Sequence, residues 1–242
     1  MKKNLFTLTL FSFALFGCSQ MQQIASQLPA TGTAQGVGGI SNMKIADGLK
    51  QALELGVLDG VQKLGKKDGF WGDQMTRILL PKELQKVDQT LRSIGLGSLA
   101  DEGVKLLNRA AEDAVTEAAP IFKDAIMGMN FQDAKGILLG PETAATQYLS
   151  QRTNQQLFKA FEPKVQASLG KVGADKIWER MITQYNNVSR EKVNPNLTAY
   201  VTEQAIGSVF KMVEQKEIGI RNNIGLRTTP LLQEVFGLQD KR

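Results

Sequence analysis

The sequence predicts an all-α fold, a compact multi-helix bundle over residues 43–238. Three observations predict it. From Met43 onward, apolar residues recur every three or four positions, which is the spacing of one helix face. Prolines, glycines and Asn or Thr residues divide this pattern into segments of helical length. No segment alternates apolar and polar residues as a half-buried strand does, so short connections should join helices alone.

The first 17 residues have the pattern of a secretory signal peptide. Two lysines within the first three residues precede twelve uncharged residues, Leu5 to Phe16, and this run is too short to span a bilayer as a helix. Leu15-Phe16-Gly17-Cys18 resembles the bacterial lipobox, in which the cysteine receives lipid, although Phe16 is bulkier than usual there. An ordinary signal peptide with an incidental cysteine is the alternative. Because Cys18 is the only cysteine in 242 residues, we favour lipidation.

Residues 18–42 are predicted to form a lipidated, flexible tether. Positions 19–42 carry no charge and are rich in Gln, Ser, Thr, Ala and Gly. A flexible chain of this length has a typical span of roughly 27 Å. The helical domain should therefore be able to stand away from the bilayer or reach back to it.

The first half of the domain should contain four helices. The first has an apolar stripe of Ile45, Leu49, Leu53, Val57, Val61 and Leu64. Its glycines, Gly48, Gly56 and Gly60, lower helix propensity and therefore indicate close packing against another helix. A second helix should begin at Pro81 and stop at Gly95, and a third should cover 98–119. Pro120 then starts or kinks the fourth helix.

The second half should contain shorter helices and one long one. Asn130 is predicted to cap a helix over 131–139, and Pro141 to begin another that ends near Leu149. Thr153 is predicted to cap a separate run with a kink at Pro163. Further helices are expected at the apolar stripe of 177–185, after the cap at Asn196, and after Thr228-Thr229-Pro230. Residues 239–242 are expected to form a polar C-terminal tail.

Composition excludes several kinds of chemistry. The chain has no histidine and one cysteine, so Ser-His-Asp and Cys-His catalysis and the usual zinc or copper sites cannot form. No phosphate-binding glycine loop or calcium loop is present, and we expect no cofactor and no metal. Loss of residues 1–17 removes Lys2 and Lys3 and lowers the formal net charge from +5 to +3. This mild, interspersed charge argues against nucleic acid as a partner.

Four stretches of the sequence resemble a known bacterial family. They are KKDGFWGDQMTRILLPKELQKV (66–87), LNRAAEDAVTEAAPIFKDAI (107–126), FQDAKGILLGPETAATQYL (131–149) and RTTPLLQEVF (227–236). Together they are similar to the family catalogued as domain of unknown function 4197 (DUF4197), over about 45–238. The resemblance implies an α-helical domain, often on exported or lipid-anchored proteins. It implies no established activity, so no residue roles are transferred.

Two clusters are candidate binding sites. Phe70 and Trp71 follow paired lysines in a loop between two helices, which would suit a membrane interface or a ligand mouth. The favoured alternative is that both rings fold back onto the core. Asn108, Arg109 and Glu112 form a polar stripe on the third helix, which could line a pocket. A solvated face on which Arg109 pairs with Glu112 and Asp113 is the favoured alternative.

These observations lead to two hypotheses about function. The preferred one is a membrane-anchored cell-envelope lipoprotein, on the outer membrane facing the periplasm, since Ser19 after the cysteine resembles the outer-membrane sorting signal. Its helical domain would bind a partner protein or an apolar ligand without catalysis. The rival is an envelope enzyme that uses Asp or Glu, Lys or Tyr on a cell-wall or lipid substrate. A deep pocket with convergent carboxylates would favour the enzyme, and a solid core with a broad apolar groove would favour binding.

Overall fold

The computed structural model describes residues 39–240 except 94, 96, 172, 177, 178, 180–182, 184, 185, 187–191 and 193–195. The predicted signal peptide, Cys18 and most of the predicted tether lie outside the described residues. So do Ile177, Trp178, Met181, Ile182 and Tyr185, which form the predicted stripe in 177–185.

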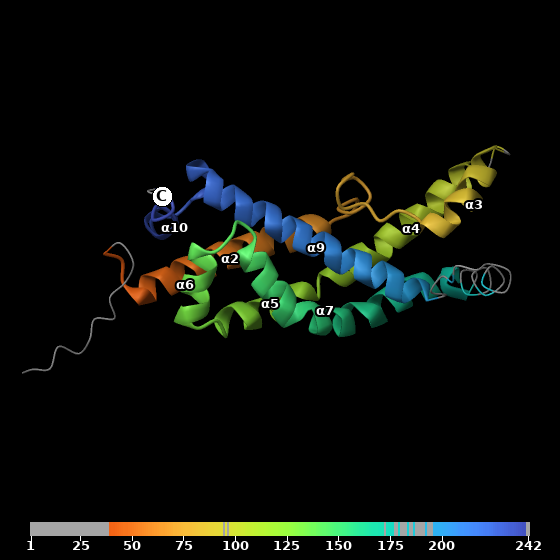
Figure 1. Cartoon of the computed structure of the whole chain (residues 1–242). Coiled ribbons are helices and arrows are strands. Elements are labelled where there is room, and N and C mark those ends of the chain that lie inside the picture. The colour runs from red at the N-terminus through yellow and green to blue at the C-terminus, as the bar shows by residue number, and fades with distance from the viewer. Residues whose placement is uncertain are drawn as a thin grey trace, which may run out of the picture. The chain divides into compact units, whose positions relative to one another are not determined.

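Eight α-helices and one 3-10 helix make up the described part of the chain, which confirms the all-α prediction (Figure 1). They are α2 (Asn42–Leu64), α3 (Lys82–Ser93), α4 (Gly97–Val115), α5 (Ala118–Met127), α6 (Phe131–Leu139), α7 (Ala144–Gly170), α9 (Leu197–Asn222), η1 (Ile224–Leu226) and α10 (Pro230–Phe236). The long helix α9 packs against α7, α2 and α4. Helix α2 also contacts α5, α6 and α10, so α2 and α9 organise the core.

Side-chain caps define several of the helix starts. The side chains of Asn130, Asn196 and Thr229 accept backbone N–H bonds at the starts of α6, α9 and α10, as the sequence predicts. Asp133 completes a capping box with Asn130. Ser41 caps α2, and Ile40 is buried in the core, so ordered structure begins within the segment that was predicted as tether, 18–42.

Three predicted boundaries differ from the structure, and the smallest difference is that α7 begins at Ala144 rather than at Pro141. The helix predicted over 98–119 is divided, because α4 ends at Val115 and Pro120 lies in the first turn of α5. Proline has no N–H to donate, which the first turn of a helix tolerates and the interior does not. The predicted helix start at Thr153 is wrong: Thr153 is buried inside α7, where its hydroxyl donates to the Leu149 carbonyl at 2.7 Å. That bond to the preceding turn satisfies the hydroxyl inside the helix, so it does not cap a new one.

The apolar stripe of α2 is buried as predicted, and its glycines allow close approach by other helices. All six stripe residues belong to the core. A Cβ atom at Gly48 would lie 2.6 Å from Cγ2 of Val235 on α10. At Gly56 and Gly60 it would lie 3.3 Å from the Cβ atoms of Lys216 and Met212 on α9. The prediction of close helix packing at these glycines is confirmed.

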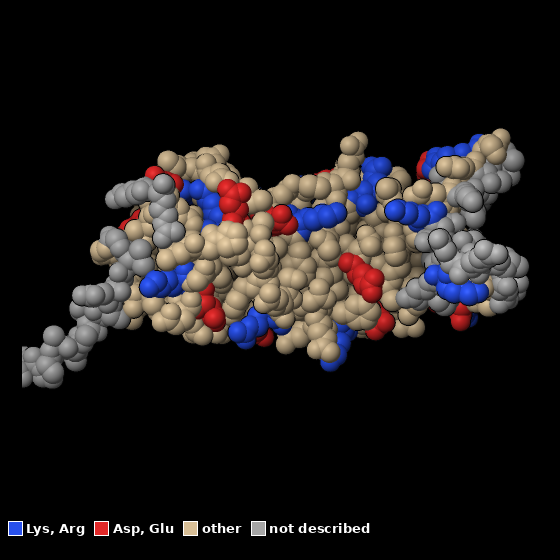
Figure 2. All heavy atoms as spheres, in the orientation of Figure 1, with Lys and Arg blue, Asp and Glu red and all other residues tan. Residues whose placement is uncertain are grey.

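Acidic and basic side chains are interspersed on the surface shown in Figure 2. Some pair across helices, such as Lys216 with Asp59 at 2.6 Å and Lys164 with Glu117 at 2.9 Å. These groups are largely exposed, and each pair contributes about 0–1 kcal/mol to stability. The apolar core is therefore the main source of stability in the described domain.

Candidate functional site

The two clusters that the sequence singles out meet in the structure. The Glu112 carboxylate on α4 accepts hydrogen bonds from the backbone N–H groups of Phe70 and Trp71, at 3.2 and 3.5 Å. Glu112 is buried, and its other oxygen pairs with Arg109. Arg109 also donates to Asp68 at 2.7 Å. Helix α4 therefore holds the start of the loop that joins α2 to α3.

Asn108 holds the other end of the same loop. Its amide oxygen accepts from Ile78 N–H, and its amide nitrogen donates to the carbonyls of Ile78 and Val104, all at 2.8 Å. Asn108 is fully buried, so these three bonds compensate for the loss of hydration of the amide. Asn108 and Glu112 are both buried, and their side chains anchor the backbone of this loop.

Arg109 has the environment of an ion-paired surface residue. The hydrogen bond with Glu112, and then the negative charges of Glu112 and Asp68, raise the pKa of the guanidinium above its usual range. Arg109 pairs with Glu112 and Asp68 rather than with Asp113, and Asp113 accepts from the Ser168 hydroxyl at 2.6 Å.

Phe70 and Trp71 have different surroundings. The Phe70 ring is fully buried, which agrees with folding back onto the core. Trp71 is half-buried, and its carbonyl accepts from Arg77 Nε at 2.6 Å. The Arg77 guanidinium carbon lies 4.5 Å from the centre of the Trp71 ring, a cation–π contact. Of these two rings, therefore, only that of Trp71 is accessible to another molecule.

Trp71 and Arg77 line an open groove of about 320 Å³ between the loop, α3 and α4. We call it the Trp71 groove, and its lining is Trp71, Arg77, Leu79, Leu80, Gln85, Gln89, Arg92, Asp101 and Val104. Arg92 and Asp101 form an ion pair at 2.5 Å across the groove. The hydrogen bond from Arg92 lowers the pKa of Asp101, so both groups are charged at neutral pH.

A second groove lies along the seam between α2 and α5. This seam groove has a volume of about 300 Å³ and is lined by Glu54, Val57, Leu58, Ala119, Pro120, Lys123 and Ile126. Its lining is mostly apolar, and Leu58 is 47% exposed. Beyond the groove, Met127 is exposed and its carbonyl accepts from Lys50 Nζ at 3.1 Å.

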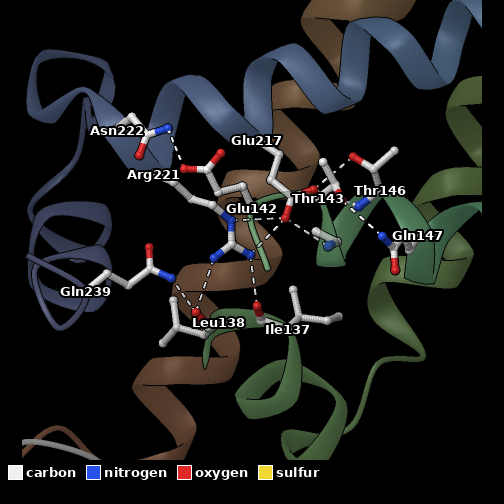
Figure 3. Close-up of polar contacts among 11 residues, drawn as sticks. Ile137, Leu138, Glu142, Thr143, Thr146, Gln147, Glu217, Arg221, Asn222 and Gln239 are labelled. Carbon is white, nitrogen blue, oxygen red and sulfur yellow. Dashed lines mark hydrogen bonds and ion pairs between the residues drawn. The ribbon is translucent and has the colours of Figure 1, made fainter. Parts of the chain in front are cut away.

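The sequence analysis missed a buried charged cluster on α9 (Figure 3). Glu217 accepts from Ala145 N–H at 2.9 Å and from Thr146 N–H and Oγ1 at 2.8 Å each. Arg221 donates to Glu217 Oε1 from Nη2 at 2.8 Å. Arg221 also donates to the carbonyls of Ile137 and Leu138, at 2.8 and 3.2 Å. One ion pair thus satisfies both the start of α7 and the end of α6.

The end of the described chain joins this region through Arg227. The Arg227 guanidinium forms two hydrogen bonds with Asp240, at 2.5 and 2.8 Å, and donates to the carbonyls of Ile220 and Arg221. Gln239 donates to the Leu138 carbonyl. The start of the predicted tail, 239–242, is therefore bonded to the domain. The sequence signal for the Glu217 and Arg221 pair is weak, since Glu and Arg four residues apart are common on exposed helix faces.

The buried carboxylates of these clusters are occupied by backbone groups and arginines. The cavity beside Glu217 and Arg221 has a volume of about 20 Å³, enough for about one water molecule. In the part of the chain that the structure describes, no group of three or more Asp, Glu, Cys or His side chains is placed to hold a metal ion. Glu112 and Glu217 thus have the environment of structural residues.

The fold and these clusters define an all-α domain in which buried charges join helices and loops to one another. The chain belongs to the family described as protein of unknown function (DUF4197), whose model matches residues 39–237. No curated protein and no solved structure matches the chain. Within the described residues, no helix combines the length and the apolarity needed to cross a membrane.

Proposed function

We propose that this protein is a lipoprotein of the bacterial cell envelope, attached through Cys18 to the outer membrane on its periplasmic side, and that its helical domain binds a partner protein. The seam groove between α2 and α5 carries the second part of this proposal. An open, mostly apolar groove on a folded domain is the kind of surface that binds apolar side chains of another protein.

The shape and rim of the seam groove favour a protein over a small apolar ligand. Its volume of about 300 Å³ is at the lower limit for small-molecule sites, and such sites bury most of their ligand. An open groove of this size suits one or two anchoring side chains of a partner. Glu54 and Lys123 give the rim charges of both signs, which can fix the orientation of a partner.

The enzyme alternative lacks support from the described geometry. Acid–base catalysis by two carboxylates needs a cleft in which they converge with unlike environments. Glu112 and Glu217 instead accept two or three hydrogen bonds each from the chain itself. Binding through the seam groove is therefore the preferred function.

The anchor is tested by metabolic labelling with a fatty acid, comparing wild type with Cys18→Ala. We expect label in the wild-type protein alone, together with sedimentation of the wild type with the outer membrane. Labelling of the variant, or sedimentation of wild type with the inner membrane, would contradict the proposed attachment.

Binding is tested by site-specific photocrosslinking in intact envelopes. A photoreactive residue at Leu58 in the seam groove is compared with one at Gln155, an exposed position on α7. We expect a discrete protein adduct from position 58 only. The protein identified in that adduct, once purified, should bind the Leu58→Glu variant more weakly than the wild type. Equal adducts from both positions, or adducts with lipid alone, would contradict binding of a partner protein here.

A further inference from the structure

We propose that the Trp71 groove is a separate binding site, and that it takes the free α-carboxylate at the end of a peptide together with the last side chain. This inference does not depend on the lipid anchor or on the seam groove. It rests on the arrangement of Arg77, on the charge balance of the groove, and on the side chains that surround them.

Arg77 is held in one orientation with unused hydrogen-bond donors. Its Nε donates to the Trp71 carbonyl at 2.6 Å, and its guanidinium carbon lies over the Trp71 ring, 4.5 Å from the ring centre. Its two terminal NH₂ groups donate no hydrogen bond to the described residues, and the described carboxylate that its charge influences is Asp101. A guanidinium with a fixed plane and free donors binds a carboxylate through two parallel hydrogen bonds, with little loss of side-chain freedom.

The charge balance of the groove fits a single negative charge. Among the described lining residues, Arg77 and Arg92 are positive and Asp101 is negative. Asp101 pairs with Arg92 and also interacts with the charge of Arg77, so these three residues leave one positive charge in excess. A carboxylate neutralises this charge, whereas a phosphate dianion would leave an excess negative charge close to Asp101. The groove therefore suits a carboxylate better than a phosphate.

The remaining lining residues fit the atoms next to a terminal carboxylate. Gln85 and Gln89, four residues apart on α3, present side-chain amides that can both donate to and accept from peptide backbone. Leu79, Leu80 and Val104 offer an apolar surface for a side chain. Leu79 is 59% exposed, so its side chain is accessible to a ligand. The volume of about 320 Å³ suits the end of a peptide rather than a long segment.

The test uses the full-length protein in detergent micelles and a fluorescein-labelled Gly-Gly-Gly-Leu peptide, with binding followed by fluorescence polarisation. We expect the free-acid peptide to bind and its C-terminal amide to bind at least tenfold more weakly. We expect inorganic phosphate to compete poorly. Equal affinity of the acid and the amide peptide would overturn the proposal. So would displacement of the labelled peptide by phosphate at concentrations similar to those at which unlabelled peptide displaces it.

Variants assign the binding to the groove. Arg77→Ala should weaken binding at least tenfold, whereas Lys67→Ala, which removes a positive charge from the same loop but outside the groove, should change it less than twofold. Equal effects of the two substitutions would mean that the peptide binds by general attraction to positive charge, and would overturn the proposal. Arg77→Ala also removes a contact with Trp71, so a second pair of variants is made on the exposed face of α3. Gln89→Glu should weaken binding and Gln89→Lys should not; the same response to both would contradict the proposal.

Discussion

Glu217 and Arg221, one turn apart on α9, form an ion pair at 2.8 Å that joins two other helices. The carboxylate accepts the N–H groups that begin α7, and the guanidinium donates to carbonyls that end α6 (Figure 3). Both side chains are only 4% exposed. Burying an ion pair costs hydration free energy, and this cost is offset only when further hydrogen bonds satisfy both charged groups. The bonds to α6 and α7 satisfy them here.

Removal of one member of this pair should be strongly destabilising. Glu217→Gln leaves the buried Arg221 charge without its partner, and we expect a loss of about 3–5 kcal/mol in the free energy of unfolding. Chemical denaturation of the purified domain measures this loss. The double variant Glu217→Gln with Arg221→Met should lose less than the sum of the two single variants, because the two residues act together.

The matched control is Lys216→Ala on the same helix. Lys216 pairs with Asp59 on the surface, so its loss should cost less than about 1 kcal/mol. A similar cost for Glu217→Gln would show that the buried pair contributes no more than an exposed one.

Gly48→Ala should destabilise the domain although alanine favours helices. The new methyl group would lie 2.6 Å from Cγ2 of Val235, so α2 and α10 would have to separate. We expect a net loss of about 1–3 kcal/mol by thermal or chemical denaturation, as for other overpacked cores. Gly207→Ala on α9 is the control, because its methyl group would meet no atom within 4 Å; it should stabilise by about 0.5–1 kcal/mol. Equal stabilisation by both changes would contradict the close packing.

Asp73 should make the stability of the loop region depend on acid pH. The hydrogen bond from Lys63 Nζ at 2.9 Å, and then that from Met75 N–H, hold the pKa of Asp73 below its ordinary value of 3.8. Because the folded pKa is lower than the unfolded one, the stabilisation is present above about pH 4 and is lost as pH falls through the folded pKa. The stability difference between wild type and Asp73→Asn should therefore shrink as the pH falls below about 4.

Urea denaturation at a series of pH values measures that difference. Glu203→Gln, which removes an exposed carboxylate from α9, controls for the general effect of lost negative charge. A difference between wild type and Asp73→Asn that stays constant over the whole range would contradict the role of the Lys63 contact.

Phe70 and Trp71 should respond differently to truncation. Phe70→Ala removes a fully buried ring and should cost about 3–5 kcal/mol of stability. Trp71→Ala removes a half-buried ring with a cation–π contact worth about 0.5–1 kcal/mol, so it should cost less than half as much. Thermal unfolding of the two variants compares the costs; equal costs would mean that Trp71 is also a core residue.

Local signals determined much of the fold. The spacing of Ile45, Leu49 and Leu53 marks a buried helix face, and Asn130 and Thr229 mark helix starts, because both depend on residues within one or two turns. The glycines of α2 indicated close helix packing, but not that Val235, Lys216 and Met212 would be the neighbours.

The tertiary structure decided the roles of the polar residues. In the sequence, Asn108 and Glu112 form an ordinary polar stripe, and only the docking of the 70–78 segment on α4 buries them against backbone groups. Glu217 and Arg221 look like an exposed helix pair, yet they lie where α6 ends and α7 begins, against α9. Helix periodicity and caps are local and can be predicted from neighbouring residues. The burial of this ion pair depends on helix ends that lie more than seventy residues away in the sequence, so residues near Glu217 and Arg221 in the chain cannot predict it.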